Sequence, residues 1–408
     1  MNSPGFIVTP REVAWQSLFQ ALQQLVPAEK DYFSLCFLLP KGFFRKPPPS
    51  FAQLRHELGK TRLEAGDSEC LVEHMISQYA AYVDARLAMM GFYERLAALP
   101  SVDGQSLTEL LQTLGPTSSS SFHHPALSAL ESALSAERAT ATRLLRCCVQ
   151  LGRVHDLAAL LDLQEGARRL QSWLKDLELD ARSAGAHSTV GGWFPFGFSS
   201  KTTTQELSLC QWYKSFLETL VWKFGLYFYA VFSRQIPEPE FKAQYSSLSP
   251  QNFVQKLLSF QKKYDSVVNV CLFVIGEELP DFKGVGYVVP SDNADRLPKG
   301  LESCPFLCCL PADKPPAPFV HPHLVMLVAQ KADALQAQLG RCVAVYDKTK
   351  KVSFFLAKFE VKGVYFAAIL AGKRPDREAV SVAAFIQELY KELSCERLVQ
   401  QLRSAMKA

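Results

Sequence analysis

The chain has 408 residues, of which 48% are hydrophobic and 21% are charged. This length exceeds what one compact core usually holds, and the composition is that of a globular protein, so two buried cores are expected. The formal net charge is only +4, and no run of five like charges occurs. A nucleic-acid-binding protein or a polybasic membrane-binding segment is therefore not predicted.

The first half of the chain is predicted to be helical. Thr9-Pro10-Arg11-Glu12 is a helix start, because Thr can cap, Pro suits the first turn and Glu completes a capping box. This helix is expected to run toward Val26 and to continue, after Pro27, through Tyr32 and Leu38. Ser50 is predicted to cap a short second helix. Residues 70–98 carry a wide apolar stripe at helical spacing, which predicts a long amphipathic helix.

Three more long helices are expected before residue 235. A capping box at 106–109 predicts an auxiliary helix, and His124 with Pro125 opens a helix to about Leu151. The next two are placed at about 154–179 and 205–233, with a loop at 183–204 between them. The stretch 216–232 contains Glu218 and Lys223 and is shorter than the roughly 20 apolar residues of a membrane span, so it predicts a buried core helix.

The second half changes character after the Pro-rich segment 236–239. Ser249-Pro250 starts a helix to about Tyr264, and 267–275 is a nearly continuous apolar run, as expected of a strand buried on both faces. Further strands are predicted at 287–290, 306–310, 324–329, 342–346, 352–359 and 364–370, and helices at 331–339 and 377–402.

These elements predict an α+β protein with two domains. The first is an all-helical bundle at 1–235, and the second is a mixed α/β domain at 236–408. The order of strand, helix, three strands and helix in the second domain is similar to that of profilin-like domains of the roadblock and longin type. That similarity is one of fold alone.

The eleven cysteines are scattered, with adjacent pairs at 147–148 and 308–309. Adjacent cysteines rarely bridge each other, so reduced thiols in a cytosolic setting are expected. His321-Pro322-His323 lies near Cys304, Cys308 and Cys309 and resembles half of a metal site. Strand alternation should point Cys308 and Cys309 to opposite faces, so no zinc site is predicted. Residues 1–9 do not read as a secretory signal.

Other features favour a protein without catalytic activity. Gly284-Val285-Gly286 does not open a helix, so it is interpreted as a turn and not as a phosphate cradle. The sequence contains no P-loop, serine nucleophile elbow, His-Glu-x-x-His or kinase signature. We therefore expect no catalytic residue, no resident metal and no cofactor.

Trp193, Phe194, Phe196 and Phe198 lie together in a segment rich in Gly, Ser and Thr. Large aromatic side chains in a loop either fill a groove of the protein itself or contact a partner, and aromatic residues dominate interface energetics. Both interpretations stay open, and these four residues are the candidate partner-binding site.

Several stretches, in the same order along the chain, resemble the KICSTOR subunit two family. The first is 122–132, FHHPALSALES. The others are Ala85-Arg86, Phe92-Tyr93-Glu94, Phe228-Tyr229, Ser233-Arg234-Gln235, Lys263-Tyr264-Asp265, Gly284-Val285-Gly286-Tyr287, Pro298-Lys299-Gly300, Leu310-Pro311-Ala312-Asp313 and Val345-Tyr346-Asp347. The likeness runs from about residue 70 to 395 and marks the chain as a divergent relative or paralogue.

The resemblance implies a scaffold role within the KICSTOR assembly. The implied partners are a kaptin-like protein, an FG-GAP-repeat propeller, a very large scaffold subunit and the Rag-directed GATOR complex. The implied place is the cytoplasm, peripheral on the lysosomal membrane through those partners, in nutrient-dependent negative regulation of mTOR signalling. The alternative from a different class is a small-molecule or nucleotide-binding regulatory protein that uses the second domain, at the 284–286 turn or at His321 and His323.

Overall fold

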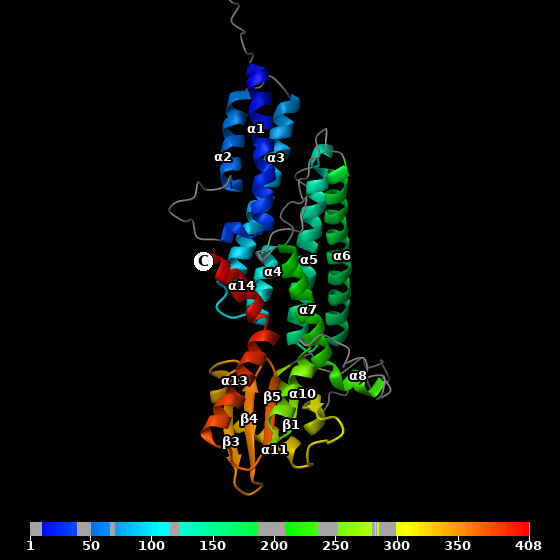
Figure 1. Cartoon of the computed structure of the whole chain (residues 1–408), viewed down its shortest axis with the longest axis vertical. Coiled ribbons are helices and arrows are strands. Elements are labelled where there is room, and N and C mark those ends of the chain that lie inside the picture. Colours follow the sequence, from blue (N-terminus) through cyan, green and yellow to red (C-terminus); the bar gives the residue numbers. More distant parts are fainter. Residues whose placement is uncertain are drawn as a thin grey trace, which may run out of the picture.

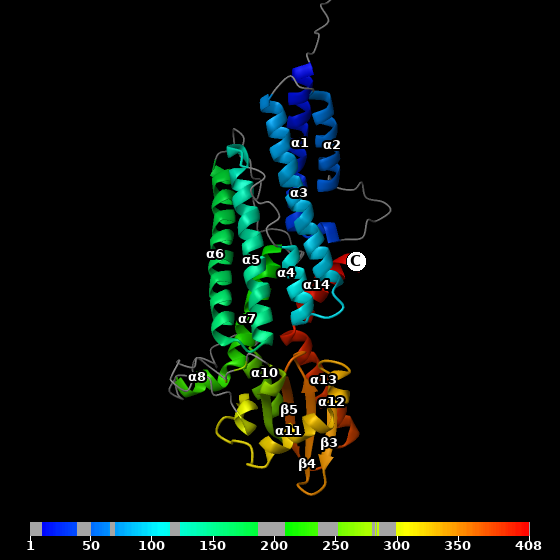
Figure 2. The same cartoon turned by 180° about the vertical axis from the view of Figure 1, so that it is seen from behind.

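Amphipathic helices occupy the first part of the chain, and an antiparallel sheet occupies the second. The computed structural model describes residues 10–38, 50–65, 70–114, 123–186, 209–235, 252–279 and 299–407, together with Phe282 and Gly284. The molecule is elongated, with the long helices side by side at one end and the sheet with its covering helices at the other (Figures 1 and 2).

The first part of the chain contributes seven labelled helices to the bundle in the described ranges. They are α1 (Pro10–Phe33), α2 (Phe51–Ala65), α3 (Cys70–Ala98), α4 (Gly104–Thr113), α5 (Ser128–Gly152), α6 (Asp156–Ala186) and α7 (Leu209–Tyr227). In both views α1, α2 and α3 form one group and α5, α6 and α7 a second, with α4 between them (Figures 1 and 2). Short 3-10 helices are η1 (Cys36–Leu38), η3 (Pro125–Leu127), η4 (Gly276–Glu278) and η5 (Gly300–Ser303).

Of the helix caps predicted within the described residues, those at Ser50 and His124 are confirmed, whereas Thr9 lies outside the described residues. The Ser50 hydroxyl accepts a hydrogen bond from the Gln53 amide at 3.2 Å, and His124 Nδ1 accepts one from the Ala126 amide at 3.1 Å. The capping box at 106–109 is wrong. Asp103 caps α4 instead, because its Oδ1 accepts from the amides of Gln105 and Ser106 at 3.0 and 2.9 Å.

Helix boundaries differ from the prediction at three places. α1 continues through Pro27, as predicted, but ends at Phe33 and not at Leu38, and α6 extends to Ala186, four residues into the expected loop. The helix expected at 205–233 is two helices, α7 and α8 (Tyr229–Gln235), separated at Phe228. In the second half of α7 one face is buried, through Leu220, Lys223, Phe224, Leu226 and Tyr227, whereas Val221 is exposed. None of the described helices is both long and apolar enough to cross a bilayer.

The sheet has five antiparallel strands in the order β2-β1-β5-β4-β3. The strands are β1 (Val267–Val274), β2 (Phe306–Leu310), β3 (Val343–Asp347), β4 (Val352–Lys358) and β5 (Val364–Ala371). β1 lies between β2 and β5, and seven of its eight residues are buried, as its continuous apolar run predicted. The candidate strand 287–290 lies outside the described residues.

One predicted strand is wrong. Residues 324–329 lie in the helix α11 (Val320–Gln330), which is followed by α12 (Ala332–Gln336) within the predicted helix 331–339. Leu324, Leu327 and Val328 have the spacing of one helix face, and all three are buried against the sheet. A short apolar run has the same composition as a buried strand, so the run alone did not distinguish the two.

The predicted closing helix 377–402 is two helices that go to different places. α13 (Asp376–Leu393) lies on the sheet with α10 (Phe253–Lys263), and α14 (Glu396–Lys407) lies in the bundle (Figure 1). Cys395 separates them with a φ of 61°. Arg403 Nε on α14 donates to the Ala97 carbonyl at the end of α3 at 2.7 Å, and Trp212 Nε1 donates to the Leu398 carbonyl at 3.1 Å.

The apolar cores are consistent with the return of α14 to the bundle. One continuous apolar core runs from the bundle helices into the sheet face that carries α10 and α13. A separate, smaller core fills the opposite face, beneath α11 and α12. The main core therefore joins the helical part to the sheet, and groups at this junction are fixed by both.

Candidate functional site

The predicted aromatic partner site belongs to the segment between α6 and α7. Trp193, Phe194, Phe196 and Phe198 lie outside the described residues, between the end of α6 and the start of α7. They remain a prediction.

The histidines that resembled half of a metal site have local partners. His321 Nε2 lies 2.6 Å from the Cys304 carbonyl oxygen, and the His321 ring contacts Phe306. His323 Nε2 lies 3.6 Å from Asp347 Oδ2. The two rings therefore interact with different strands and loops and do not converge.

The neighbouring cysteines separate as strand alternation predicted. Cys308 packs in the main core, whereas Cys309 lies on the opposite face, with its Sγ 3.4 Å from Cys271 Sγ. Within the described residues no group of three His, Cys, Asp or Glu side chains could hold a metal ion. Gly284 has a φ of 113°, which suits a glycine turn, and the rest of the 284–286 motif lies outside the described residues.

A buried ion pair joins the bundle to the sheet. Lys223 Nζ on α7 lies 2.6 Å from Oε1 of Glu360, which belongs to the turn between β4 and β5. The Tyr227 hydroxyl, one turn further along α7, donates to the same oxygen at 2.9 Å. A Cβ atom at Gly152, the last residue of α5, would lie 3.1 Å from Glu360 Oε2. Two bundle helices therefore close around one carboxylate of the sheet.

The ion pair keeps the buried lysine charged. Burial by itself lowers the pKa of Lys223, but the Glu360 carboxylate together with Tyr227 and the nearby thiols outweighs burial, so the pKa lies well above its usual value. The side chain of Lys223 is 2% exposed and that of Glu360 is 14% exposed. Loss of either partner would leave the other charge in a water-poor environment, so this pair fixes how the two parts meet.

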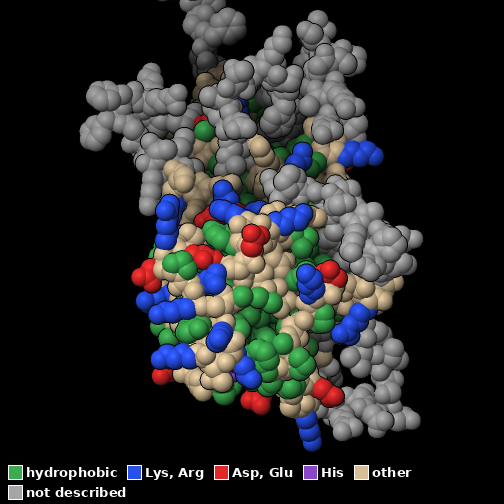
Figure 3. Space-filling view, turned by 60° about the horizontal axis from the view of Figure 1, so that its bottom comes forward, with side chains coloured by type: hydrophobic (Ala, Val, Ile, Leu, Met, Phe, Trp, Pro, Cys, Tyr) green, Lys and Arg blue, Asp and Glu red, His purple; other side chains and the backbone are tan. Residues whose placement is uncertain are grey.

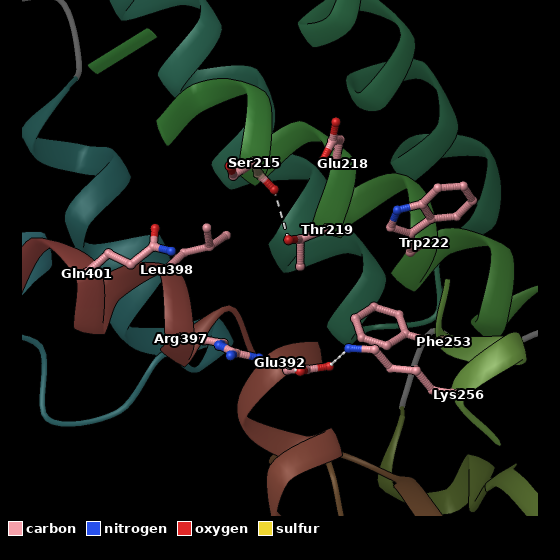
Figure 4. Close-up of a pocket in the computed structure, with 10 residues that line it drawn as sticks. All are labelled: Ser215, Glu218, Thr219, Trp222, Phe253, Lys256, Glu392, Arg397, Leu398 and Gln401. Carbon is pink, nitrogen blue, oxygen red and sulfur yellow. Dashed lines mark hydrogen bonds and ion pairs between the residues drawn. The ribbon is translucent and has the colours of Figure 1, made fainter. Parts of the chain in front are cut away.

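A cavity of about 330 Å³ lies where the bundle meets the helices that cover the sheet. Its lining comes from α7, α10, α13 and α14, as Figure 4 shows. The lining residues are Ser215, Glu218, Thr219, Trp222, Phe253, Lys256, Glu392, Arg397, Leu398 and Gln401. The cavity therefore belongs to the junction and not to the sheet alone.

The charges of this cavity are largely paired with each other. Lys256 and Arg397 lie on either side of Glu392 and both form ion pairs with it, the second at 2.6 Å (Figure 4). The lining contains no cysteine or histidine, so it offers neither a thiol nucleophile nor an imidazole base. Mixed charges beside two aromatic rings suit a small polar ligand or a side chain of a partner.

A second buried charge cluster lies inside the bundle. Arg86 on α3 donates through Nε to Glu29 Oε1 on α1 at 2.9 Å and through Nη1 to Glu137 Oε2 on α5 at 2.6 Å. The Tyr32 and Tyr93 hydroxyls donate to Glu137 Oε1 at 2.5 and 2.7 Å. Three helices from both bundle groups thus meet at one guanidinium.

The cluster holds two carboxylates against one cation. Burial, together with the nearby Glu137 carboxylate, raises the pKa of Glu29 more than Arg86 and the Tyr82 hydroxyl lower it. Burial lowers the pKa of Arg86, but Glu29 and its neighbours outweigh this effect, so the guanidinium stays charged. All three charged side chains are at most 4% exposed, so the cluster has no access for a substrate and acts within the structure.

Comparison with known sequences identifies the family of this chain. A family model described as "KICSTOR complex C12orf66 like" matches residues 9–407. The chain belongs to this KICSTOR family. It is similar to KICSTOR subunit 2 of Danio rerio, with 32% identity over 394 residues that cover 92% of this chain and 84% of the relative. It is also similar to KICSTOR subunit 2 of Xenopus laevis, with 29% identity over 413 residues, 97% of this chain and 89% of the relative.

The match to the KICSTOR family includes both the bundle and the sheet. The resemblance seen in the sequence is thereby confirmed. Sequence reasoning missed the buried cluster and the junction pair, although each left a signal. Arg86 interrupts the apolar stripe of 70–98, and Lys223 interrupts the apolar run of 216–232. A charge inside an apolar stripe predicts a buried partner but does not say which residue supplies it.

Proposed function

We propose that this chain is a non-catalytic scaffold subunit of a KICSTOR assembly. In this proposal it recruits the Rag-directed GATOR complex to the lysosomal surface when nutrients fall, so that mTOR signalling is lowered. The observation that carries the proposal is the family match over residues 9–407, which includes every described element. The proposed partners are a kaptin-like protein, an FG-GAP-repeat propeller and the large scaffold subunit.

The architecture supports a scaffold role on physical grounds. A scaffold holds binding surfaces at fixed positions, which requires that its parts do not rotate against each other. The continuous main core and the Lys223–Glu360 pair provide this constraint. We propose further that residues 1–235 and 236–408 are two domains and that the second is profilin-like.

The partner surface proposed here includes Trp193, Phe194, Phe196 and Phe198. Aromatic side chains bury a large area at little entropic cost, which suits an interface.

Co-purification tests the scaffold proposal. A tagged chain is recovered from its own cells under conditions that keep large complexes intact, and the eluate is analysed by mass spectrometry. We expect the kaptin-like protein, the propeller and the large scaffold subunit in stoichiometric amounts. Recovery of the chain without them would refute the scaffold proposal.

The cavity at the junction favours a second candidate function, a small-molecule-binding regulatory protein. Its lining offers both charges and the Trp222 and Phe253 rings. A ligand that binds the folded state and not the unfolded state raises the melting temperature, and the rise grows with the ratio of ligand concentration to Kd. A thermal-shift screen of polar metabolites and nucleotides on the full chain tests this function, with Thr219→Trp as the variant that fills the cavity. A ligand must stabilise the unmodified chain and not the variant.

A further inference from the structure

The sheet presents four loops at the end that faces away from the bundle. β1 and β4 begin at this end, and β2, β3 and β5 finish at it, as their antiparallel pairing requires. The four loops are 264–266, 311–319, 348–351 and 372–375. We call the loops, with the helix ends next to them, the distal surface. Figure 1 shows it as the pole of the molecule opposite α1 and α2.

The distal surface is basic. Its lysines and arginines are Lys262, Lys263, Lys314, Lys348, Lys350, Lys351, Lys373, Arg374 and Arg377. Its carboxylates are Asp265, Asp313, Asp347, Asp376 and Glu378. All of the basic residues except Arg374 are exposed. Asp347 and Glu378 already have local partners, because Asp347 accepts from the amides of Thr349 and Lys350 and Glu378 pairs with Arg374.

Apolar side chains lie among these charges. Pro315 and Pro318 project from the loop 311–319, and the Phe319 ring lies 5.0 Å from Lys350 Nζ. Val268 and Val380 are 48% and 69% exposed near the same end. Figure 3, which brings this end forward, shows blue basic side chains around green hydrophobic ones, with fewer red carboxylates.

We propose that the distal surface binds directly to an anionic lipid bilayer. Lysines near a negatively charged membrane each add to the attraction, and apolar side chains between them enter the headgroup region. The strand ends that carry the loops span about 20 Å, which is a broad contact and not a single pocket. The basic surface could not be recognised from the sequence alone, because its charged residues come from separate loops.

The choice of cation favours a membrane over an acidic peptide. Seven of the nine basic residues are lysines, and one of the two arginines is paired with Glu378. Lysine is a compact point charge that suits a fluid array of headgroups, whereas recognition of a defined carboxylate or phosphate favours the arginine fork.

This inference goes beyond the scaffold proposal, which attaches the chain to the membrane only through partners. Vesicle binding by the purified full chain needs no partner, so the two proposals fail separately.

The test is co-sedimentation with vesicles. We expect the chain to bind vesicles of phosphatidylcholine with phosphatidylserine, to bind phosphatidylcholine alone far more weakly, and to dissociate as salt is raised. The variant Lys314→Glu/Lys348→Glu/Lys373→Glu reverses one exposed charge in each of three loops. It should lower the vesicle affinity by on the order of 100-fold, from about 1 kcal/mol per lysine.

A matched control changes the same net charge elsewhere. Lys60, Lys175 and Lys214 are exposed on α2, α6 and α7, and their replacement by Glu should leave most of the vesicle affinity intact. Circular dichroism melting checks that both triple variants fold. An equal loss of vesicle affinity in both triple variants would overturn the proposal. Failure of the unmodified chain to bind anionic vesicles would also overturn it. Binding to polyglutamate without binding to vesicles would also overturn it and point to an acidic protein partner.

Discussion

Arg86 is a buried cation held by two carboxylates, and this imbalance makes it the most sensitive side chain of the bundle. Arg86→Met keeps the length of the side chain but leaves Glu29 and Glu137 buried without a cation. We expect a loss of about 3–5 kcal/mol in the free energy of unfolding, measured with urea. Adding Glu137→Gln to this variant should restore part of the loss, because one uncompensated charge is removed.

Arg55 provides the control for Arg86. It pairs with Asp84 of α3 at 2.7 Å, but both side chains are about half exposed. Arg55→Met should therefore cost no more than about 1 kcal/mol. Similar losses in the two variants would mean that burial of the Arg86 cluster is not what makes it stabilising.

Glu29 should give the bundle a specific pH dependence. Its pKa is raised by burial above the ordinary 4.5, so the folded state holds the proton more tightly than the unfolded state. The stabilisation is complete below 4.5 and is lost as the pH rises through the folded pKa. Glu29→Gln should remove this loss. The difference in the free energy of unfolding between wild type and variant, measured with urea at a series of pH values, should therefore change between pH 4.5 and the folded pKa of Glu29. If the free energy of unfolding changed with pH in the same way in both proteins, this prediction would be wrong.

For single residues, the sequence indicates which side chains are unusual but not which residues they contact. Arg86 meets Glu29 and Glu137 from 57 and 51 residues away along the chain. Helical periodicity places Arg86 on the apolar face of its own helix and carries no information on the facing helices. The pairing follows from the packing of α1, α3 and α5, which one sequence does not specify.

Among the elements, α4 offers a direct test of its corrected cap. Asp103 accepts from two orphan amides at the start of α4, so Asp103→Ala should cost about 1 kcal/mol of unfolding free energy. Ser106→Ala, at the position that the sequence favoured as the cap, should cost clearly less in the same denaturation assay. The opposite ranking would restore the predicted capping box.

Prediction of the elements succeeded for the long periodic helix and for most of the strands, but failed for one short apolar run and for one helix break. The helix 70–98 and the strands 306–310, 342–346, 352–359 and 364–370 are confirmed within one or two residues at each end. The run 324–329 is too short for its period to separate helix from strand. The break at Cys395 was also missed, because helical periodicity continues on both sides of a single residue with positive φ.

For the whole molecule, Glu360 is the test of how the two parts are joined. Glu360→Ala leaves the Lys223 ammonium buried without its partner, and we expect a loss of about 3–5 kcal/mol in unfolding free energy. Hydrogen exchange should rise at the end of α7 and in the turn between β4 and β5. Glu388→Ala, with a side chain that is 56% exposed, should change neither by much. Unchanged exchange at the junction in Glu360→Ala would show that the apolar core alone fixes the two parts.

The aromatic segment 193–198 is proposed to bind partner proteins in the assembly. Replacing Trp193, Phe194, Phe196 and Phe198 by Ser should sharply reduce co-purification of the partners and leave the melting temperature nearly unchanged. A large fall in melting temperature would mean that these side chains are part of the core. Replacing Ser199 and Ser200 by Ala in the same segment provides the control and should alter neither measurement.

The sequence predicted an α+β molecule and its family, but not the junction that unites it. The cavity and the Glu360 pair arise where α7 meets α10, α13 and the β4–β5 turn, which are far apart in the chain. The distal surface has the same origin. Its lysines are dispersed through the sequence and gather only because antiparallel strands bring their connecting loops to one end.

The return of α14 to the bundle has a consequence for genetics. A premature stop codon just before this helix would spare all five strands of the sheet and yet remove the contacts of Arg403 with α3 and of Leu398 with α7. The damage from such a late nonsense allele should therefore fall on the N-terminal helices and reduce the amount of protein in the cell. Partner maps drawn from C-terminal deletions would then assign to the last twelve-residue helix an interface that lies elsewhere.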